Sequence, residues 1–212
     1  MNIKRFEVGP FAENTYLLTH AADALLVDPG FSNDREFKQF RSELANSGCS
    51  LRAVVLTHAH IDHLLGLPAV LEAFDVDVYL NHTDLTPWKN IAQQAKMFGL
   101  QAVNLEFTPA RLPDNGLFSV GPFQMEILYT PGHAPDHVSL YFESESMVIA
   151  GDTLFKQSVG RTDLYKGDSD TLKKSIREKL YTLPGETVVY PGHGPETTIG
   201  EEARSNPFVR GK

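Results

Sequence analysis

Three histidines and one aspartate lie within six residues, in the segment His58-Ala59-His60-Ile61-Asp62-His63. Side chains two positions apart in an extended or turning chain project to the same side, so His58 and His60 can bind one metal ion together. Asp62 and His63 are expected on the first turn of a following helix, displaced from that ion. Because two-metal hydrolytic sites hold their ions about 3.5–4 Å apart, the segment predicts a site for two metal ions rather than a loop with incidental histidines.

Three further candidate ligands each follow a strand-like run and a tight turn. His133 and His193 come after Pro-Gly turns, and Asp152 comes directly after Gly151. Side chains at strand ends point into the crevice where ligands bind in layered α/β proteins. Each of these residues alone would be typical of a structural position, but together with the 58–63 segment they indicate one metal centre.

The elements that would position these residues are strands in runs, with helices between the runs and after them. A buried, valine-rich strand leads directly into His58, and Ser32 or Asn33 is expected to cap the first helix. This order indicates an α/β protein in which two mixed sheets pack face to face with helices outside. Strands are expected over 4–8, 14–20, 23–28, 51–57, 76–80, 118–120, 125–129, 138–143, 147–150 and 187–190, and helices over 35–45, 64–74, part of 84–98, 169–180 and 199–204.

The helical stretch 84–98 carries three large apolar side chains. Trp88, Met97 and Phe98 are expected to pack against the rest of the protein rather than bind a ligand. Aromatic side chains in this stretch could nevertheless line the mouth of a cleft.

The bulk composition is that of an ordinary globular protein of 212 residues, with 42% apolar and 22% charged residues. No linker or low-complexity tract divides the chain, so a single domain over residues 1–212 is expected. The net charge of −8 argues against a nucleic-acid partner, because proteins that bind nucleic acids usually carry a basic face.

The sequence also predicts the cellular compartment of the protein. No apolar signal region follows Met1, and the longest apolar runs are far too short to span a bilayer. Cys49 is the single cysteine, so no intrachain disulfide can form. A cytoplasmic protein without membrane contact is therefore expected.

The histidine and aspartate series resembles the signature of the metallo-β-lactamase superfamily, from residue 58 to residue 193. The early run Val27-Asp28-Pro29-Gly30 is also similar to that family. Within the superfamily, the chain is similar to the short glyoxalase II-like hydrolases, over residues 57–66, 130–140, 151–155 and 191–194. The resemblance implies the four-layer αβ/βα sandwich of the metallo-β-lactamase fold and a metal-dependent hydrolase.

The resemblance also implies how two divalent ions would share the seven candidate ligands. The first ion would be held by His58, His60 and His133 and the second by Asp62, His63 and His193, with Asp152 bridging them. Imidazole and carboxylate ligands suit Zn²⁺ and also Fe or Mn. Zn²⁺ is the expected metal, with Fe or Mn as alternatives.

The expected reaction is hydrolysis of a small anionic thioester, S-lactoylglutathione or a related acyl-thiol. Two cations lower the pKa of a shared water, so that a hydroxide can attack the carbonyl carbon near neutral pH, and Asp62 would orient this nucleophile. A thiolate leaves with little help from a general acid, and no residue obviously supplies one. Arg161 could clamp a substrate carboxylate, with help from Lys156.

Two departures from the resembling family bear on the substrate. Asp136 stands where a glycine is common and would add negative charge near the metals, and His137 matches a histidine frequent in glyoxalase II that would support the ligands from behind. The helical C-terminal extension that binds glutathione in classical glyoxalase II enzymes has no counterpart after His193 in this sequence. Hydrolysis of a thioester is therefore better supported than S-lactoylglutathione in particular.

Other functions stay open on the sequence alone. Persulfide dioxygenases resemble this branch but use one iron, so a mononuclear iron dioxygenase is the main alternative. Another ester or lactone hydrolase, or a metal-binding module without activity, is the lesser one. A nuclease is disfavoured by the net charge of −8 and by the lack of an inserted domain between Asp152 and His193, and a secreted β-lactamase by the missing signal region. The native metal, the thiol, the acyl group and the oligomeric state are left open.

Overall fold

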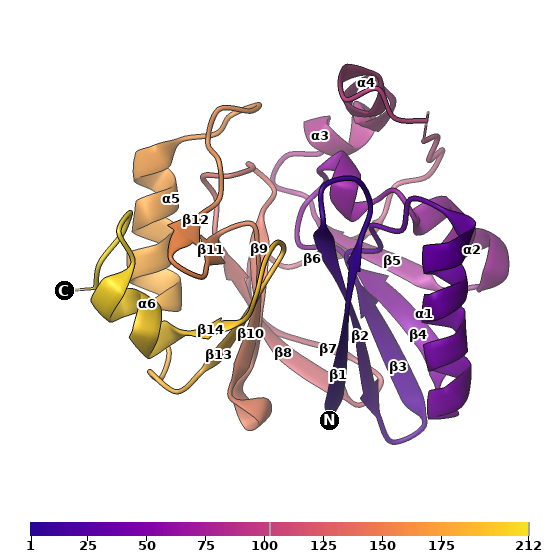
Figure 1. Ribbon diagram of the computed structural model, residues 1–212, viewed down its shortest axis with the longest axis horizontal. Coiled ribbons are helices and arrows are strands. Elements are labelled where there is room, and N and C mark those ends of the chain that lie inside the picture. The colour runs from indigo at the N-terminus through magenta and orange to yellow at the C-terminus, as the bar shows by residue number, and fades with distance from the viewer. Residues whose placement is uncertain (102, 212) are drawn as a thin grey trace.

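Two mixed β-sheets lie face to face in the computed structural model, which describes residues 1–101 and 103–211 (Figure 1). The first sheet contains, in spatial order, β1 (Asn2–Val8), β2 (Glu13–His20), β3 (Asp23–Val27), β4 (Ser50–Val55), β5 (Asp77–Asn81) and β6 (Ala110–Leu112). The second contains β14 (Thr197–Thr198), β13 (Val188–Pro191), β10 (Met147–Gly151), β9 (Val138–Phe142), β8 (Phe123–Tyr129) and β7 (Asn115–Val120). A small hairpin of β11 (Leu154–Phe155) and β12 (Ser158–Val159) stands apart from both sheets.

Helices cover the outer faces of the two sheets (Figure 1). On the first sheet lie α1 (Asp34–Ser47) and α2 (Leu67–Ala73); on the second lie α5 (Ser169–Ser175), its π-helical continuation η3 (Ile176–Leu180) and α6 (Ile199–Ser205). The short helices α3 (Thr86–Lys89) and α4 (Ile91–Met97) lie at one end of the molecule, and the 3₁₀ turns η1 (Ile61–His63) and η2 (Glu143–Glu145) lie in loops. The predicted α/β fold, a four-layer αβ/βα sandwich, is confirmed.

The inner strands are buried on both faces. In β3, Leu25 and Val27 point into the core between the two sheets, whereas Ala24 and Leu26 point towards α1 and α2. Successive side chains of a strand alternate between its faces, so a strand covered on both sides is apolar along its whole length. For this reason the Ala-Leu-Leu-Val run is already visible as a strand in the sequence.

Capping residues define both ends of α1. The side-chain oxygen of Asn33 accepts hydrogen bonds from the backbone N–H groups of Arg35 and Glu36, each at 3.1 Å. The helix ends at Gly48, whose φ of 67° is left-handed, a conformation that glycine adopts without steric cost. Of the two caps that the sequence offered, Asn33 is the one used.

The helical regions near the metal motifs differ from the prediction. The expected helix 64–74 begins only at Leu67, because Pro68 occupies the first turn, where proline is tolerated; residues 61–63 form the separate turn η1. The 84–98 stretch is divided at Asn90, whose φ of −103° and ψ of 19° are not helical. Asparagine side chains compete with the helix backbone for hydrogen bonds.

Four short strands were not predicted by the sequence pattern. Each is two or three residues long, which is too short for an alternating pattern to be recognised. They are β6, β11, β12 and β14.

One edge of the sandwich collects the carboxyl ends of its parallel strands. In the first sheet β3, β4 and β5 run parallel, and in the second β10 runs parallel to β13. Ligands in layered α/β proteins bind beyond the carboxyl ends of the strands. The loops that follow β4, β8, β10 and β13 carry the predicted ligands.

Two broader expectations concern the chain as a whole. Within the described residues, no helix combines the length and the apolar character needed to cross a membrane. The single domain over residues 1–212 stays a prediction, and residues 102 and 212 lie outside the described residues.

Candidate metal centre

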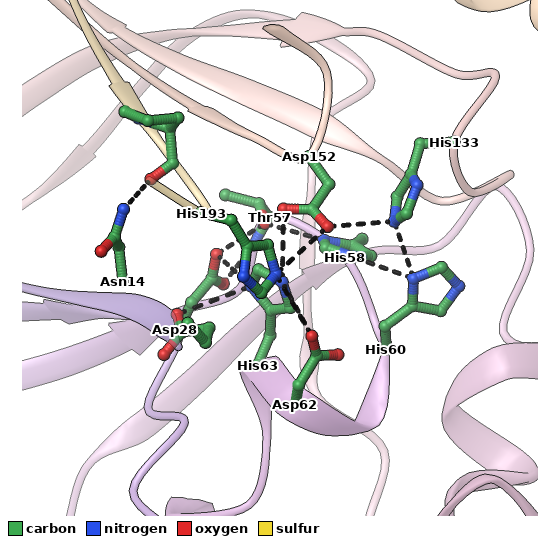
Figure 2. A network of polar contacts seen from close by, with 12 residues as sticks. Asn14, Asp28, Thr57, His58, His60, Asp62, His63, His133, Asp152 and His193 are labelled. Carbon is green, nitrogen blue, oxygen red and sulfur yellow. Dashed lines mark hydrogen bonds and ion pairs between the residues drawn. The ribbon is translucent and has the colours of Figure 1, made fainter. Parts of the chain in front are cut away.

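All seven predicted ligands lie together where loops from both sheets meet (Figure 2). Two of them follow β4, two belong to η1, and the others follow β8, β10 and β13. The first cluster is defined as His58, His60 and His133, and the second cluster as Asp62, His63 and His193; Asp152 completes the set.

The three imidazoles of the first cluster point nitrogen atoms at one another. His60 Nδ1 lies 3.1 Å from His58 Nε2 and 2.8 Å from His133 Nε2. The outer nitrogens are engaged elsewhere: His58 Nδ1 lies 3.0 Å from Thr57 Oγ1, and His133 Nδ1 donates to the Arg161 carbonyl oxygen at 2.8 Å. With their protons on these outer nitrogens, His58 and His133 present the lone pairs of Nε2 to the centre.

Lone pairs this close repel one another unless a cation lies between them. A single proton on His60 Nδ1 can serve only one of the two facing nitrogens at a time. Converging neutral imidazoles are a typical ligand set for Zn²⁺ and related ions. The first cluster therefore fits a metal ion by the geometry of its own side chains.

The second cluster mixes a carboxylate with two imidazoles. Asp62 Oδ2 lies 3.3 Å from His193 Nε2 and 3.9 Å from His63 Nε2. The outer nitrogens are again held, because His193 Nδ1 donates to the Phe11 carbonyl oxygen at 3.1 Å and His63 Nδ1 lies 3.1 Å from Asp28 Oδ2. Both rings thus turn Nε2 towards the centre.

Asp152 lies between the two clusters. Its Oδ2 is 3.4 Å from His133 Nε2 and 3.5 Å from His193 Nε2, and its Oδ1 is 3.5 Å from His63 Nε2. Among the described residues, His63 Nε2 and Asp152 Oδ1 are buried without a hydrogen-bond partner. Buried polar atoms nearly always have partners, so the residues present fit two metal ions, with Asp152 in reach of both.

Burial keeps the first cluster uncharged. It lowers the pKa of His60 to about 3, with His133 adding to the effect. It also lowers the pKa of His58 and of His133. An imidazolium is costly in a buried site beside other imidazoles. The three rings are therefore uncharged at neutral pH and can bind a cation without first losing a proton.

Carboxylates reverse this balance in the second cluster. Burial lowers the pKa of His63, but Asp152, Asp62 and Asp28 outweigh burial and raise it well above its ordinary value. Burial also lowers the pKa of His193, but Asp62 and Asp152 raise it by more than burial lowers it. The pKa values of Asp62 and Asp152 are lowered despite burial, because histidines surround them. A metal ion must displace protons to bind here.

Asp28 supports a ring in each cluster. Its carboxylate accepts hydrogen bonds from the Thr57 N–H at 2.8 Å and from the Thr57 hydroxyl at 2.6 Å. The same carboxylate contacts His63 Nδ1, and Thr57 Oγ1 contacts His58 Nδ1. The backbone of Asp28 has a φ of 50°, a left-handed conformation in which aspartate is enriched.

The structure places His137 and Asp136 behind the ligands. His137 Nε2 accepts the Asp152 N–H at 3.0 Å, and its Nδ1 lies 2.9 Å from Thr130 Oγ1. Asp136 Oδ2 accepts a hydrogen bond from the N–H of Ala59 at 2.9 Å. In the sequence, Ala59 lies between two ligands of the first cluster. Burial raises the pKa of Asp136 to about 7, so its carboxyl carries less negative charge at neutral pH than the sequence suggested.

A cavity of about 370 Å³, the metal cavity, opens onto both clusters. Its lining contains Asp152 and members of both clusters, with Phe11, Phe98 and Phe155 among the remaining side chains. The aromatic rings make its walls apolar, whereas its floor is formed by the ligands. A small substrate can therefore reach both clusters at once.

The two predicted substrate-binding cations lie differently with respect to this cavity. Arg161 lines it, but its guanidinium donates to both carboxylate oxygens of Asp163 at 2.7 Å. Lys156 is exposed and lies outside the described lining. Asp163 thus occupies the Nε–Nη2 edge of the guanidinium, and a substrate carboxylate would have to bind the Nη1–Nη2 edge or displace Asp163.

Comparison with known proteins agrees with the motif series. The family model described as the metallo-beta-lactamase superfamily matches residues 8–193. The chain belongs to the metallo-β-lactamase superfamily. The match includes all seven ligands, and the family predicted from them is confirmed.

Two relatives align with this protein over its full length. It is 40% identical over 216 residues to "Probable metallo-hydrolase YqgX" of Bacillus subtilis (strain 168), covering 100% of this chain and 99% of the relative. It is 34% identical over 216 residues to "Hydroxyacylglutathione hydrolase GloC" of Haemophilus influenzae, covering 100% of both. Both names are consistent with the predicted glyoxalase II-like branch.

Two solved structures share the superfamily fold over nearly the whole chain. A "BLEG-1 B3 metallo-beta-lactamase" superposes with a TM-score of 0.88 at 36% identity, covering 98% of this chain and 99% of the other. "TTHA1623 in a di-iron-bound form" superposes with a TM-score of 0.87 at 36% identity, covering 97% and 100%. The second of these shows that a similar protein can hold two iron ions.

Three residues of β2 support the site without any clear sign in the sequence. Asn14 Nδ2 and the Tyr16 hydroxyl donate to the Pro191 carbonyl oxygen at 2.9 and 2.6 Å, which holds the loop before His193. The Glu13 carboxylate lies 3.7 Å from His63 Nδ1. The polar run at positions 13–15, which precedes the apolar part of the strand, could have indicated Glu13 and Asn14, whereas no sequence signal distinguishes Tyr16 from a core residue.

The Pro-Gly turn before His193 has a steric reason. A Cβ on Gly192 would collide with Asp152 Oδ1 and come within 2.9 Å of His63 Cε1. Only a residue without a side chain lets the backbone pass this close to two ligands. The same turn is held by the Gly192 N–H, which donates to the Gly151 carbonyl oxygen at 2.8 Å.

Proposed function

We propose that this chain is a dinuclear-metal hydrolase that cleaves a thioester, S-lactoylglutathione or a related acyl-thiol. The observation that carries the proposal is the position of Asp152, whose two oxygens face ligands of both clusters at the floor of the metal cavity. The full-length similarity to a protein named hydroxyacylglutathione hydrolase supports the thioester class.

The residues of the centre have distinct tasks in such a reaction. Two divalent ions held by the clusters would supply an acidified water near neutral pH and polarise the substrate carbonyl. Asp62 lines the metal cavity, and its lowered pKa keeps it ionised. Its carboxylate can accept a hydrogen bond from the attacking water and so orient it towards the carbonyl carbon.

The metal cavity favours a substrate with a good leaving group. Apart from the candidate ligands, the described lining is apolar, amide or hydroxyl in character, with Arg161 as its charged exception. A thiolate departs without a proton, whereas an amide nitrogen needs a general acid. This lining therefore supports a thioester over an amide.

The metal, the compartment and the partners are further parts of the proposal. Zn²⁺ suits the ligand set, and the di-iron relative keeps iron as the alternative. Arg161 stays the candidate for an anionic group of a small substrate, since it lines the metal cavity. A cytoplasmic location without nucleic-acid or membrane partners stays a prediction from the sequence.

The test is turnover of S-lactoylglutathione, followed as thiol release on protein whose metal content is measured in the same sample. Chelator-sensitive hydrolysis with two ions per chain would support the proposal. Two bound ions without hydrolysis of any thioester would contradict it and move the search to esters and lactones. One iron per chain with oxygen uptake on glutathione persulfide would support the dioxygenase instead.

A further inference from the structure

A smaller cavity of about 230 Å³ adjoins the metal cavity. It lies between the α3–α4 pair and the loop that contains Leu164, and we call it the side groove. His60, Gln94, Phe98 and Leu164 line both cavities, so the two are continuous. Among the described residues, His60 is the only candidate ligand in its lining. The side groove therefore extends from the first cluster.

Carbon atoms make up most of the surface of the side groove, although the Thr86 hydroxyl and the amides of Asn90 and Gln93 also belong to its lining. Met97 is 68% exposed and Phe98 is 37% exposed, and both line it together with Pro87 and Leu164. Met97 is thus exposed instead of packed, contrary to the sequence-based expectation, whereas Phe98 lines the cavity mouth, as the sequence allowed for an aromatic residue, and Trp88 is buried as expected. The described lining contains no lysine, arginine, aspartate or glutamate. Exposed apolar side chains gathered beside a reactive centre are typical of a ligand-binding surface.

The polar group nearest the first cluster is already engaged. Gln94 Nε2 donates to the carbonyl oxygens of Ala59 and Pro87, each at 2.9 Å, and Gln94 Oε1 accepts the Ile61 N–H at 3.2 Å. Gln94 therefore fixes the loop that carries His60 and leaves its hydrocarbon part to the groove. A ligand in the side groove meets mostly carbon atoms.

We propose that the side groove binds the acyl chain of the substrate, so that the enzyme prefers thioesters of apolar acyl groups to S-lactoylglutathione. This inference rests on the proposed thioester hydrolysis. Biological thiol carriers contain several amides and charges. The described lining offers these groups no charged partner and only a few amide and hydroxyl groups, so burying a carrier there would leave most of its polar groups without partners. The acyl chain is the part of a thioester that can be pure hydrocarbon.

The position of His60 gives the orientation of such a substrate. When the carbonyl carbon of the thioester lies beside the candidate metal ligands, an acyl chain that extends towards His60 enters the side groove. The thiol then occupies the wider metal cavity, where Arg161 lies. This arrangement places the charged carrier near the cation and the hydrocarbon near Met97 and Leu164.

The volume of the side groove limits the chain length. At roughly 30 Å³ for each non-hydrogen atom, as in a liquid, about 230 Å³ holds a chain of about seven or eight carbons. Burial of each methylene group is expected to raise kcat/KM about fourfold. We therefore expect kcat/KM to rise from acetyl to hexanoyl or octanoyl and then to level off.

The experiment is a chain-length series on the metal-loaded enzyme. Straight-chain acyl thioesters of N-acetylcysteamine, from acetyl to decanoyl, share one small neutral thiol, and S-lactoylglutathione is measured beside them by thiol release. The ratio of kcat/KM for hexanoyl over acetyl is then compared between wild type and Met97→Glu. The matched control is Leu117→Glu, the same change at a 74% exposed leucine on β7. Taking the ratio removes any effect of the added charge on the shared thiol.

The inference predicts a ratio of about 250 for four added methylenes at about fourfold each, a fall of at least tenfold in Met97→Glu, and no fall in Leu117→Glu. A flat series with active short thioesters would overturn the acyl groove and leave thioester hydrolysis standing. A ratio unchanged in Met97→Glu would overturn the assignment to this groove. Failure of every thioester on enzyme with two ions bound would overturn the proposed function, and the inference with it.

Discussion

The two ligand clusters are built from similar side chains but lie in opposite electrostatic surroundings. The first consists of three buried imidazoles whose pKa values are lowered, chiefly by burial. In the second, carboxylates outweigh burial and raise the pKa values of His63 and His193. The side chains of His193 and Asp62 are also 24% and 20% exposed, whereas those of the first cluster are nearly inaccessible.

This difference shows that the two ions of one centre can bind with different numbers of protons released. The first cluster takes up a cation without releasing protons, because its rings are neutral. The second cluster must release protons to take up a cation, because its histidines are paired with carboxylates. The first ion should therefore be bound over a wider range of pH, and the second should respond to acid.

The largest expected effect comes from breaking the first cluster. In His58→Ala the convergent set of three imidazoles is lost, and we expect turnover to fall by more than about 100-fold, beyond the loss typical of a residue that only supports a ligand. Metal per chain and kcat/KM are measured together. His20→Ala, at an exposed histidine on the opposite end of β2, is the control. Two ions and near-normal turnover in His58→Ala would contradict the centre as described.

Asp62→Ala tests the second cluster in the same way. Here we expect turnover to be lost to a similar extent, because both a ligand and the group that orients the water are removed. The first cluster should still bind its ion, so that metal analysis finds about one ion per chain. Near-normal turnover would remove Asp62 from the mechanism.

Acid should separate the two ions without any mutation. Since the raised pKa values of His63 and His193 let protons compete near neutral pH, affinity at the second cluster should fall about tenfold per pH unit for each proton involved. The His60 pKa of about 3 keeps protons from competing at the first cluster until strongly acid pH. Metal per chain, measured after dialysis from pH 8 to pH 5, should pass through a plateau near one. Simultaneous loss of both ions would break the comparison.

Two supporting residues allow the clusters to be weakened unequally. Thr57 contacts a ring of the first cluster directly and reaches the second only through Asp28, whereas Glu13 contacts a ring of the second. Loss of such support typically costs about 10–100-fold in metal affinity. Thr57→Val should weaken binding of the ion that persists in acid, and Glu13→Gln should weaken binding of the ion that leaves first. Competition with a chelator measures both affinities. The same affinity change for both ions in either variant would contradict this separation.

The smallest effect is expected at Asp136, behind the first cluster. Its pKa is raised from 3.8 in a free side chain to about 7 in the fold, so its contribution to stability is full below about pH 4 and is lost as the pH rises through 7. Asn cannot ionise. From pH 5 to pH 8, Asp136→Asn should therefore gain about 2–3 kcal/mol of stability relative to wild type, because a weaker bond to the Ala59 N–H lowers the stability of the variant equally at both pH values and cancels in this difference.

Urea unfolding of the chelated proteins at the two pH values measures this difference. A stability difference between Asp136→Asn and wild type that does not change with pH would show that the Asp136 pKa is not raised. Because Asp136 touches neither His63 nor His193, the acid-sensitive ion should be lost over the same pH range in the variant.

The candidate ligands could be predicted because their types and local spacing are written in short segments. Four of the seven lie within residues 58–63, and the other three each follow a strand end and a tight turn. The strands themselves were visible as apolar runs, since both faces of β3 and its neighbours are buried. Supports such as Glu13 and Thr57 were not, because a polar residue shows its burial only when the partner strands are assembled.

What the sequence by itself determined is therefore the superfamily, the order of the layers and the inventory of metal-binding groups. Only the tertiary structure decided how these groups are charged, because a histidine pKa depends on the carboxylates and the burial that distant segments provide. It also decided that Arg161 faces Asp163 and that Met97 and Phe98 line a groove instead of packing inside. A local pattern specifies which atoms are available, but their surroundings come from chain segments that meet only in the folded protein.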